Sequence, residues 1–137
     1  MRKPLILVVN DDGITANGIR NLIRIMNDFG DVVVVAPDSP QSGKSHAITL
    51  EETIRCDKVK IDNGPQIECS CSGTPVDCVK LALNKLLDRK PDLCVSGINH
   101  GSNSSINVIY SGTMSAAIEG ALDGIPSIGF SLLDYSK

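Results

Sequence analysis

Two adjacent carboxylates, Asp11 and Asp12, end an apolar run near the start of the chain, in the stretch LVVNDDG. Neighbouring carboxylates repel each other and resist burial, so a fold that keeps both must offset that cost. One interpretation is a strand that turns into solvent, for which Asp-Gly is ordinary turn chemistry. The other is a site that holds a cation. For an acidic dipeptide alone, the turn is favoured.

Polar loops follow the other predicted parallel strands as well, and ligands of open α/β sheets bind beyond the carboxyl ends of strands. Carboxylate, hydroxyl and amide oxygens suit Mg²⁺, Mn²⁺ or Ca²⁺ better than zinc or copper. Taken together, these loops favour a cation site over a simple turn. Their polar residues are Asn10, Asp11 and Asp12 after the first strand, Ser39, Ser42 and Ser45 after the second, and Ser96, Asn99 and Asn103 after the third.

Ser111-Gly112-Thr113 precedes a predicted helix and has two interpretations. It is an ordinary N-terminal cap, or its free N–H groups and the helix dipole bind a phosphate. The spacing does not decide between them. Gly43-Lys44-Ser45 ends like a Walker A loop, but Asp38 stands where that motif needs glycine and the residues that follow are strand-like. We therefore reject a P-loop.

The elements that position these residues follow from hydrophobic periodicity. Continuous apolar runs predict buried strands at 5–9, 31–36, 92–97 and 127–133, and helical spacing predicts helices at 17–29, 75–87 and 113–122. Alternating residues between 48 and 72 predict short antiparallel strands inserted into this framework. The whole is expected to be one Rossmann-like α/β domain over 1–137, with a doubly wound, mostly parallel sheet. No helix follows the last strand, so a partner subunit or a longer polypeptide is expected to cover it.

Composition excludes several classes of function. A net charge of -3 and 3% aromatic residues argue against nucleic-acid binding. The five cysteines are an odd number and fit small buried hydrophobes better than a disulfide framework or a zinc site. The apolar core near the N-terminus is too short for a signal peptide, so a cytoplasmic protein that does not bind membranes is expected.

Several longer motifs occur in the order found in the SurE family of survival-protein nucleotidases, which this chain resembles over nearly its whole length. They are NDDG, VVAPDSPQSGKSHAITL, SGTPVDCV, SGINHGSN and YSGTMSAAIEGALDGIPSIGFSL. The combination is specific, although each piece alone is weak. Members of that family are considerably longer, so the resemblance implies that this chain is the N-terminal part of a longer SurE-type protein.

The resemblance also implies a metal-dependent phosphatase that acts on nucleoside 5′- and 3′-monophosphates and on short polyphosphate. One divalent cation per subunit, Mg²⁺ or Mn²⁺ with Ca²⁺ as a substitute in a crystal, and a homodimer or homotetramer are expected. Asp11 and Asp12 would be catalytic. The residues implied as metal ligands are Asp11, Asp12, Ser42 and Asn99, and those implied near the phosphate are Asn10, Gly43, Ser111, Gly112 and Thr113.

Two other classes of protein place acidic residues after a first strand. A receiver domain, the main alternative, needs a phosphoacceptor Asp after its third strand, where this chain has Ser96-Gly97-Ile98-Asn99, and a Lys after its fifth. A haloacid-dehalogenase-type phosphatase needs Asp-x-Asp, which adjacent Asp11 and Asp12 do not match.

Overall fold

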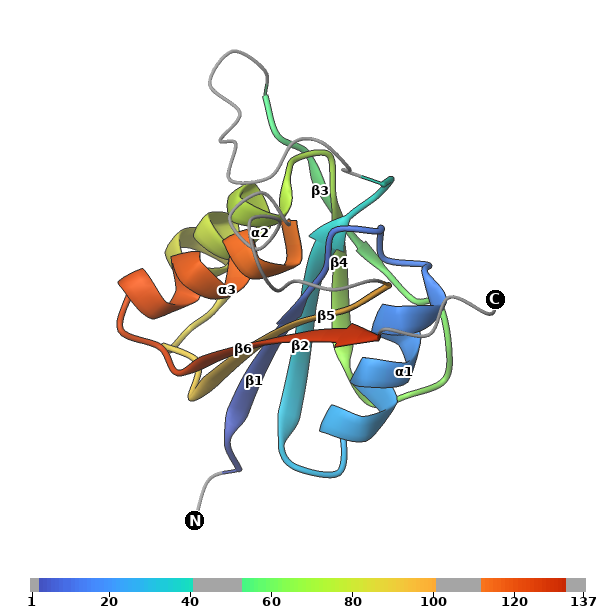
Figure 1. The fold of residues 1–137 in the computed structure, drawn as a ribbon, viewed down its shortest axis with the longest axis horizontal. Helices are drawn as coiled ribbons and strands as arrows, with labels where there is room; N and C mark the ends of the chain where they lie inside the picture. The colour runs from blue at the N-terminus through green and yellow to red at the C-terminus, as the bar shows by residue number, and fades with distance from the viewer. Residues whose placement is uncertain (1–2, 41–52, 101–111, 133–137) are drawn as a thin grey trace.

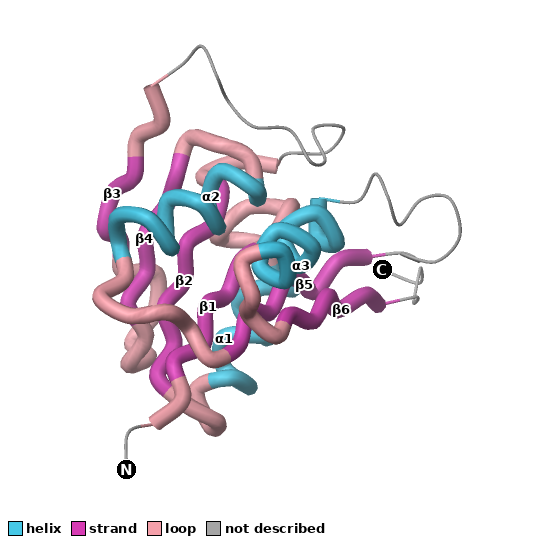
Figure 2. The backbone as a smooth tube through the Cα atoms, turned by 90° about the vertical axis from the view of Figure 1, so that its left-hand side faces the viewer, coloured by secondary structure: helices cyan, strands magenta, loops and turns pink. Residues whose placement is uncertain are grey.

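A computed structural model describes residues 3–40, 53–100 and 112–132 of the chain. Its centre is a six-stranded sheet with the strand order β3-β4-β2-β1-β5-β6, which Figure 2 shows from left to right. All neighbours pair in parallel except β3 and β4, so the predicted doubly wound, mostly parallel fold is confirmed. The strands are β1 (Leu5–Val9), β2 (Asp31–Pro37), β3 (Cys56–Val59), β4 (Ile67–Cys71), β5 (Leu93–His100) and β6 (Ser127–Leu132).

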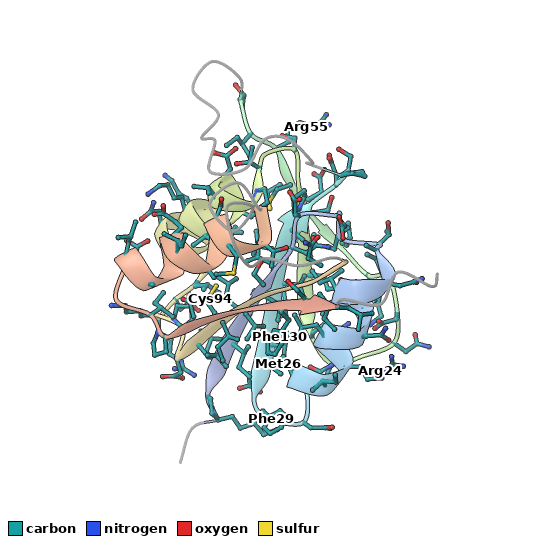
Figure 3. The ribbon with its side chains drawn as sticks, in the orientation of Figure 1. Arg24, Met26, Phe29, Arg55, Cys94 and Phe130 are labelled. Atoms are coloured by element: carbon teal, nitrogen blue, oxygen red, sulfur yellow. The ribbon has the colours of Figure 1, made fainter. Side chains whose placement is uncertain are left out.

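Helices cover both faces of the sheet (Figure 1). The helix α1 (Asn17–Met26) lies on one face, and α2 (Pro75–Leu81) and α3 (Gly112–Leu122) lie on the other. Successive strand residues point to opposite faces, so Ile6 and Val8 join the core under α1 while Leu7 and Val9 join the core under α2 and α3. Figure 3 labels Met26 and Phe130, which belong to the first of these cores, and Cys94, which belongs to the second.

The strand order reverses between β1 and β5. The chain passes from β1 outward to β2 and β4, and returns through α2 to β5 on the other side of β1. In open α/β sheets this switch point opens a crevice at the carboxyl ends of the two strands. The fold therefore places a binding crevice at the ends of β1 and β5.

The antiparallel segment differs in one respect from the prediction. β3 pairs antiparallel with β4, as expected, but β4 also pairs in parallel with β2, from Val33 opposite Ile67 to Pro37 opposite Cys71. The segment therefore extends the main sheet. Polar residues on the outer strand produced the alternating pattern, because β3 is an edge strand with exposed Asp57 and Lys58.

Two helices are shorter than their periodicity predicts. α1 ends at Met26, and residues 27–29 form a turn that brings Gly30 against the carbonyl of Pro4. α2 ends at Leu81 and continues as a wider turn over Ala82–Leu86, closed by a hydrogen bond from the Leu87 N–H to the Ala82 carbonyl at 3.0 Å. In the described parts of the chain, no helix has the length and apolar character needed to cross a membrane.

Candidate metal and phosphate site

The loop after β1 carries the acidic pair and is held tightly by its neighbours. Asn10 is buried, and its side-chain amide donates a hydrogen bond to the Gly13 carbonyl at 2.7 Å. Gly13 has a φ of +105°, a backbone conformation that favours glycine. These constraints turn the chain sharply, so that Asp11 and Asp12 stand at the end of the strand.

The loop after β2 lies directly beside this turn. The Ile14 N–H donates to the Pro37 carbonyl at 2.8 Å, and a Cβ on Gly13 would lie 3.4 Å from the backbone carbon of Ser39. The chain that leads to the predicted ligand Ser42 therefore starts against the acidic turn. Ser42 and Gly43 themselves lie outside the described residues.

The end of β5 contributes the predicted ligand Asn99 next to the same turn. β1 and β5 are in register with Val9 opposite Ser96, so the chain beyond each strand continues at the same edge. A bulge follows at Gly97, which has a φ of +136°, and the pairing with β6 resumes at Asn99. Such a bulge changes the direction of the side chains that follow it.

The start of α1 fixes this bulge in place. A Cβ on Gly18 would collide with the carbonyl oxygen of Ile98, so only glycine allows this close approach. The start of α1, which directly follows the loop that holds Asp11 and Asp12, is thereby in contact with the residue before Asn99. Three of the four predicted metal ligands, Asp11, Asp12 and Asn99, therefore lie on two segments that are close neighbours.

The start of α3 lies close to the same strands. Thr113 is buried, and its methyl carbon would be 3.6 Å from a Cβ on Gly129, which is the β6 partner of Ser96. Gly112 is the first residue of α3, as the sequence predicts. Ser111 lies outside the described residues, so its predicted role near a phosphate is not tested.

Unpartnered oxygens mark this edge of the sheet. Five buried side-chain atoms of the described residues lack a hydrogen-bond partner, and all five belong to the turn after β1, to the residue of β5 just before its bulge, or to the first turn of α3. They are Asn10 Oδ1, Asp11 Oδ1, Ser96 Oγ, Thr113 Oγ1 and Ser115 Oγ. A buried polar atom without a partner is costly, so these atoms indicate a place built for a polar ligand.

The acidic pair adds an electrostatic cost. Burial, and secondly the charge of Asp12, raise the pKa of Asp11 above its ordinary value. A bound dication would offset both effects. Among the described residues, no group of three or more His, Cys, Asp and Glu side chains could hold a metal ion. The donors present are two carboxylates with amide and hydroxyl oxygens, a set that fits a hard cation.

Some contributors to this site carry no recognisable signal in the sequence. Arg20 on α1 donates two hydrogen bonds to the buried Glu68 carboxylate, at 2.6 and 2.8 Å, and a third to the Ile14 carbonyl at 3.2 Å. The hydrogen bond with Glu68 is the main reason why the pKa of Arg20 is raised. Arg20 thus joins the loop after β1, at Ile14, to the strand β4, at Glu68, which is 48 residues away from Arg20 in the sequence. Only the folded topology shows that the two residues meet.

Comparison with known proteins gives a consistent result. The model of the family described as "Survival protein SurE" matches residues 6–137. A "5′-nucleotidase SurE" of Flavobacterium psychrophilum is 69% identical over 135 residues, which cover 98% of this chain and 52% of that protein. A protein with the same name from Chlorobaculum tepidum is 53% identical over 136 residues, which cover 99% of this chain and 51% of that protein.

The chain is also similar to solved structures. The SurE protein of Aquifex aeolicus superposes with a TM-score of 0.84 at 44% identity, over 98% of this chain and 53% of that chain. The chain therefore spans about half the length of the relatives that it matches. The family match covers nearly all of its residues, and we conclude that the chain belongs to the SurE family.

Proposed function

We propose that this chain carries the metal site and phosphate site of a divalent-cation-dependent phosphomonoester hydrolase that acts on nucleoside 5′-monophosphates. The observation that carries the proposal is the gathering of the unpartnered buried oxygens and the acidic pair at the β1/β5 switch point. The names of the relatives, 5′-nucleotidase SurE, support the substrate class.

In this proposal Asp11, Asp12, Asn99 and Ser42 hold one cation, Mg²⁺ or Mn²⁺. The half-buried Asp11 carboxylate with a free oxygen, and the bulge that directs Asn99, support this assignment. When bound, such a cation neutralises charge on phosphoryl oxygens and lowers the pKa of a nearby water.

The residues of the chain itself would position the reactants. Phosphoryl transfer depends mostly on orientation and on stabilisation of charge. The first N–H groups of α3, from Gly112 and Thr113, would bind phosphate oxygens, together with the Gly43 backbone and Ser111. Asn10 would keep the turn closed through its bond to Gly13, which leaves Oδ1 free toward the site. Asp11 or Asp12 would orient the attacking water and accept its proton.

The substrate range and the assembly are further parts of the proposal. The groups assigned to the site bind the phosphate and not the nucleoside, and on that ground we include 3′-monophosphates and short polyphosphate beside 5′-monophosphates in the proposal. We also propose that this chain forms the N-terminal part of a homo-oligomeric protein. The exposed apolar residues Ile128 and Leu132 on the edge strand β6 support a partner or further chain over that strand.

The test is phosphate release from AMP and GMP by the full chain, with Mg²⁺ or Mn²⁺ and with EDTA. We expect turnover that requires the cation and falls at least about a hundredfold in Asp12→Asn, the scale typical for loss of a group that stabilises charge in the transition state. Asp57→Asn, an exposed carboxylate on β3, is the matched control and should retain full activity. Equal rates in the wild type and Asp12→Asn, unaffected by EDTA, would refute the proposal.

The receiver interpretation makes a different prediction. Incubation with acetyl phosphate would leave an acyl phosphate on a receiver domain, whereas a phosphatase site would leave none. The end of β5 provides no carboxylate to accept the phosphoryl group, because its residues are Ser96-Gly97-Ile98-Asn99. The geometry therefore favours the hydrolase.

A further inference from the structure

All five cysteines lie on the face of the sheet that α2 and α3 cover, and four of them form a cluster between β3, β4 and α2. Cys56 lies on the edge strand β3, Cys69 and Cys71 lie two residues apart on β4, and Cys78 lies on α2. All four belong to, or pack against, the core between the sheet and α2. The Sγ atoms of Cys56 and Cys71 are 2.9 Å apart. Cys78 lies next to Cys71 and is the main reason why the pKa of the Cys71 thiol is raised.

The strand register explains why Cys56 and Cys71 meet. They are directly opposite each other in the antiparallel pair of β3 and β4. The preceding opposed pair, Arg55 and Ser72, is joined by a hydrogen bond from the Ser72 N–H to the Arg55 carbonyl at 2.9 Å. Since hydrogen-bonded and non-hydrogen-bonded pairs alternate in antiparallel sheets, Cys56 and Cys71 occupy a non-hydrogen-bonded position.

That position is compatible with a covalent bond. Cα atoms of non-hydrogen-bonded pairs are about 4.5 Å apart, and disulfides span Cα separations of about 4.4–6.8 Å. No backbone movement is needed to join the two residues. We propose that Cys56 and Cys71 are a disulfide-forming pair, oxidised by low-molecular-weight disulfides, and that this modification is independent of the proposed hydrolase activity.

The chemistry balances with one disulfide as oxidant. The Cys56 thiolate attacks one sulfur of the small disulfide and displaces one small thiolate, which takes up a proton. The Cys71 thiolate then attacks the Cys56 sulfur of the mixed disulfide and displaces the second small thiol. The protein loses two hydrogen atoms, that is two protons and two electrons, and the oxidant gains them and becomes two thiols. Cys56 is the entry point, because it is half-buried on an edge strand whereas Cys71 is fully buried.

The Cys56 thiol is almost entirely protonated at neutral pH, because its pKa is raised, and this gives the reaction a characteristic pH dependence. Burial, and secondly the bond with Cys71, raise the pKa of Cys56 to about 12. Because only the thiolate attacks a disulfide, the rate should increase about tenfold for each pH unit between 7 and 9. We therefore expect oxidation over minutes to hours at neutral pH and faster reaction at pH 9.

The test is oxidation of the full chain with oxidised glutathione, then alkylation of free thiols and tryptic digestion without reductant. Cleavage after Arg55 and Lys58 releases the tripeptide Cys56-Asp57-Lys58. We expect it linked to the peptide 61–80, which holds Cys71, with a mass lower by two hydrogen atoms than the sum of the two peptides. Dithiothreitol should separate them again.

Variants identify which cysteine forms the disulfide with Cys56. Cys71→Ala should abolish the linked species, and the half-buried Cys69→Ser, on the same face of β4, should retain it. Should Cys71→Ala fail to fold, Cys56→Ser at the sheet edge shows whether the loss of two thiols requires Cys56, and Cys69→Ser and Cys78→Ala, which should both keep the link, leave Cys71 as the partner. Three results would overturn the proposal: unmodified thiols after prolonged oxidation at pH 9, a stable glutathione adduct on Cys56, or a link that persists in Cys71→Ala and disappears in Cys69→Ser.

Discussion

Replacing Arg20 by methionine should strongly destabilise the fold, because it leaves a buried carboxylate without its cation. The Glu68 side chain is 2% exposed and Arg20 is 16% exposed, and their guanidinium and carboxylate groups form two parallel hydrogen bonds. Without Arg20, the partners of Glu68 are reduced to the amide of Gln66 at 2.8 Å. A neutral amide does not compensate a buried charge.

The expected magnitude follows from this burial. Breaking a buried ion pair by removing one partner costs about 3–5 kcal/mol, whereas replacing both partners by apolar residues is close to neutral. The second ion pair of Arg20, with Asp62, adds less than about 1 kcal/mol, because Asp62 is half exposed. We therefore expect Arg20→Met to lower the free energy of unfolding by about 3–5 kcal/mol, and Arg20→Met with Glu68→Leu to restore most of it.

The pH dependence of the wild type reports on the other ion pair of Arg20, with Asp62. In the wild type, hydrogen bonds, first from Arg20, lower the pKa of Asp62 to about 2. That contribution is present above the ordinary carboxyl range near 3.8 and is lost only as the pH falls toward 2.

The assay is urea unfolding followed by far-UV circular dichroism in EDTA, since the chain has no tryptophan. Arg24→Met, one turn further along α1, is the matched control, because Arg24 is exposed and bonds to Asn21. It should cost less than about 0.5 kcal/mol. If Arg20→Met costs as little as the control, or if adding Glu68→Leu restores none of the loss, the reasoning about Glu68 is wrong.

Three further predictions concern the site and its supports. In EDTA, Asp11→Asn should raise the thermal unfolding midpoint. The pKa of Asp11 in the folded protein lies above its ordinary value, so the charge of Asp11 lowers stability at neutral pH. A lowered midpoint would contradict this reasoning. Gly18→Ala should destabilise the protein by about 1–3 kcal/mol in urea unfolding, because the added Cβ collides with the Ile98 carbonyl, and this outweighs the helix propensity of alanine. A gain in stability would show that α1 and β5 are farther apart at this point. Thr74 caps the N-terminus of α2, where its hydroxyl accepts a hydrogen bond from the Asp77 N–H at 3.2 Å. Thr74→Ala should therefore cost about 1 kcal/mol in urea unfolding. An unchanged urea midpoint would mean that this cap does not stabilise the protein.

Much of the fold could be predicted because local pattern and tertiary burial agree. The runs at 5–9 and 31–36 are apolar on both faces, and β1 and β2 are indeed covered by helices on both faces. The acidic pair pointed to the site because carboxyl ends of parallel strands meet at one edge. That rule needs only the strand boundaries, which hydrophobic runs reveal.

The features of the fold and of the site that the sequence did not predict depend on contacts between residues far apart in the chain. The bulge at Gly97 arises from its fit against β6, and the need for glycine at position 18 arises from the Ile98 carbonyl. The partnership of Arg20 and Glu68 and the parallel pairing of β4 depend on topology in the same way. No local sequence pattern predicts these four contacts, because each residue involved is of a type that is common in the helix or strand to which it belongs.

The central claim, that the acidic turn holds a divalent cation, is tested most directly by isothermal titration of the full chain with Mn²⁺. We predict one site per chain that Asp11→Asn and Asp12→Asn each abolish and that Asp57→Asn, an exposed carboxylate outside the site, leaves unchanged. Equal Mn²⁺ binding in all four proteins, or none in the wild type, would contradict the assignment of this site.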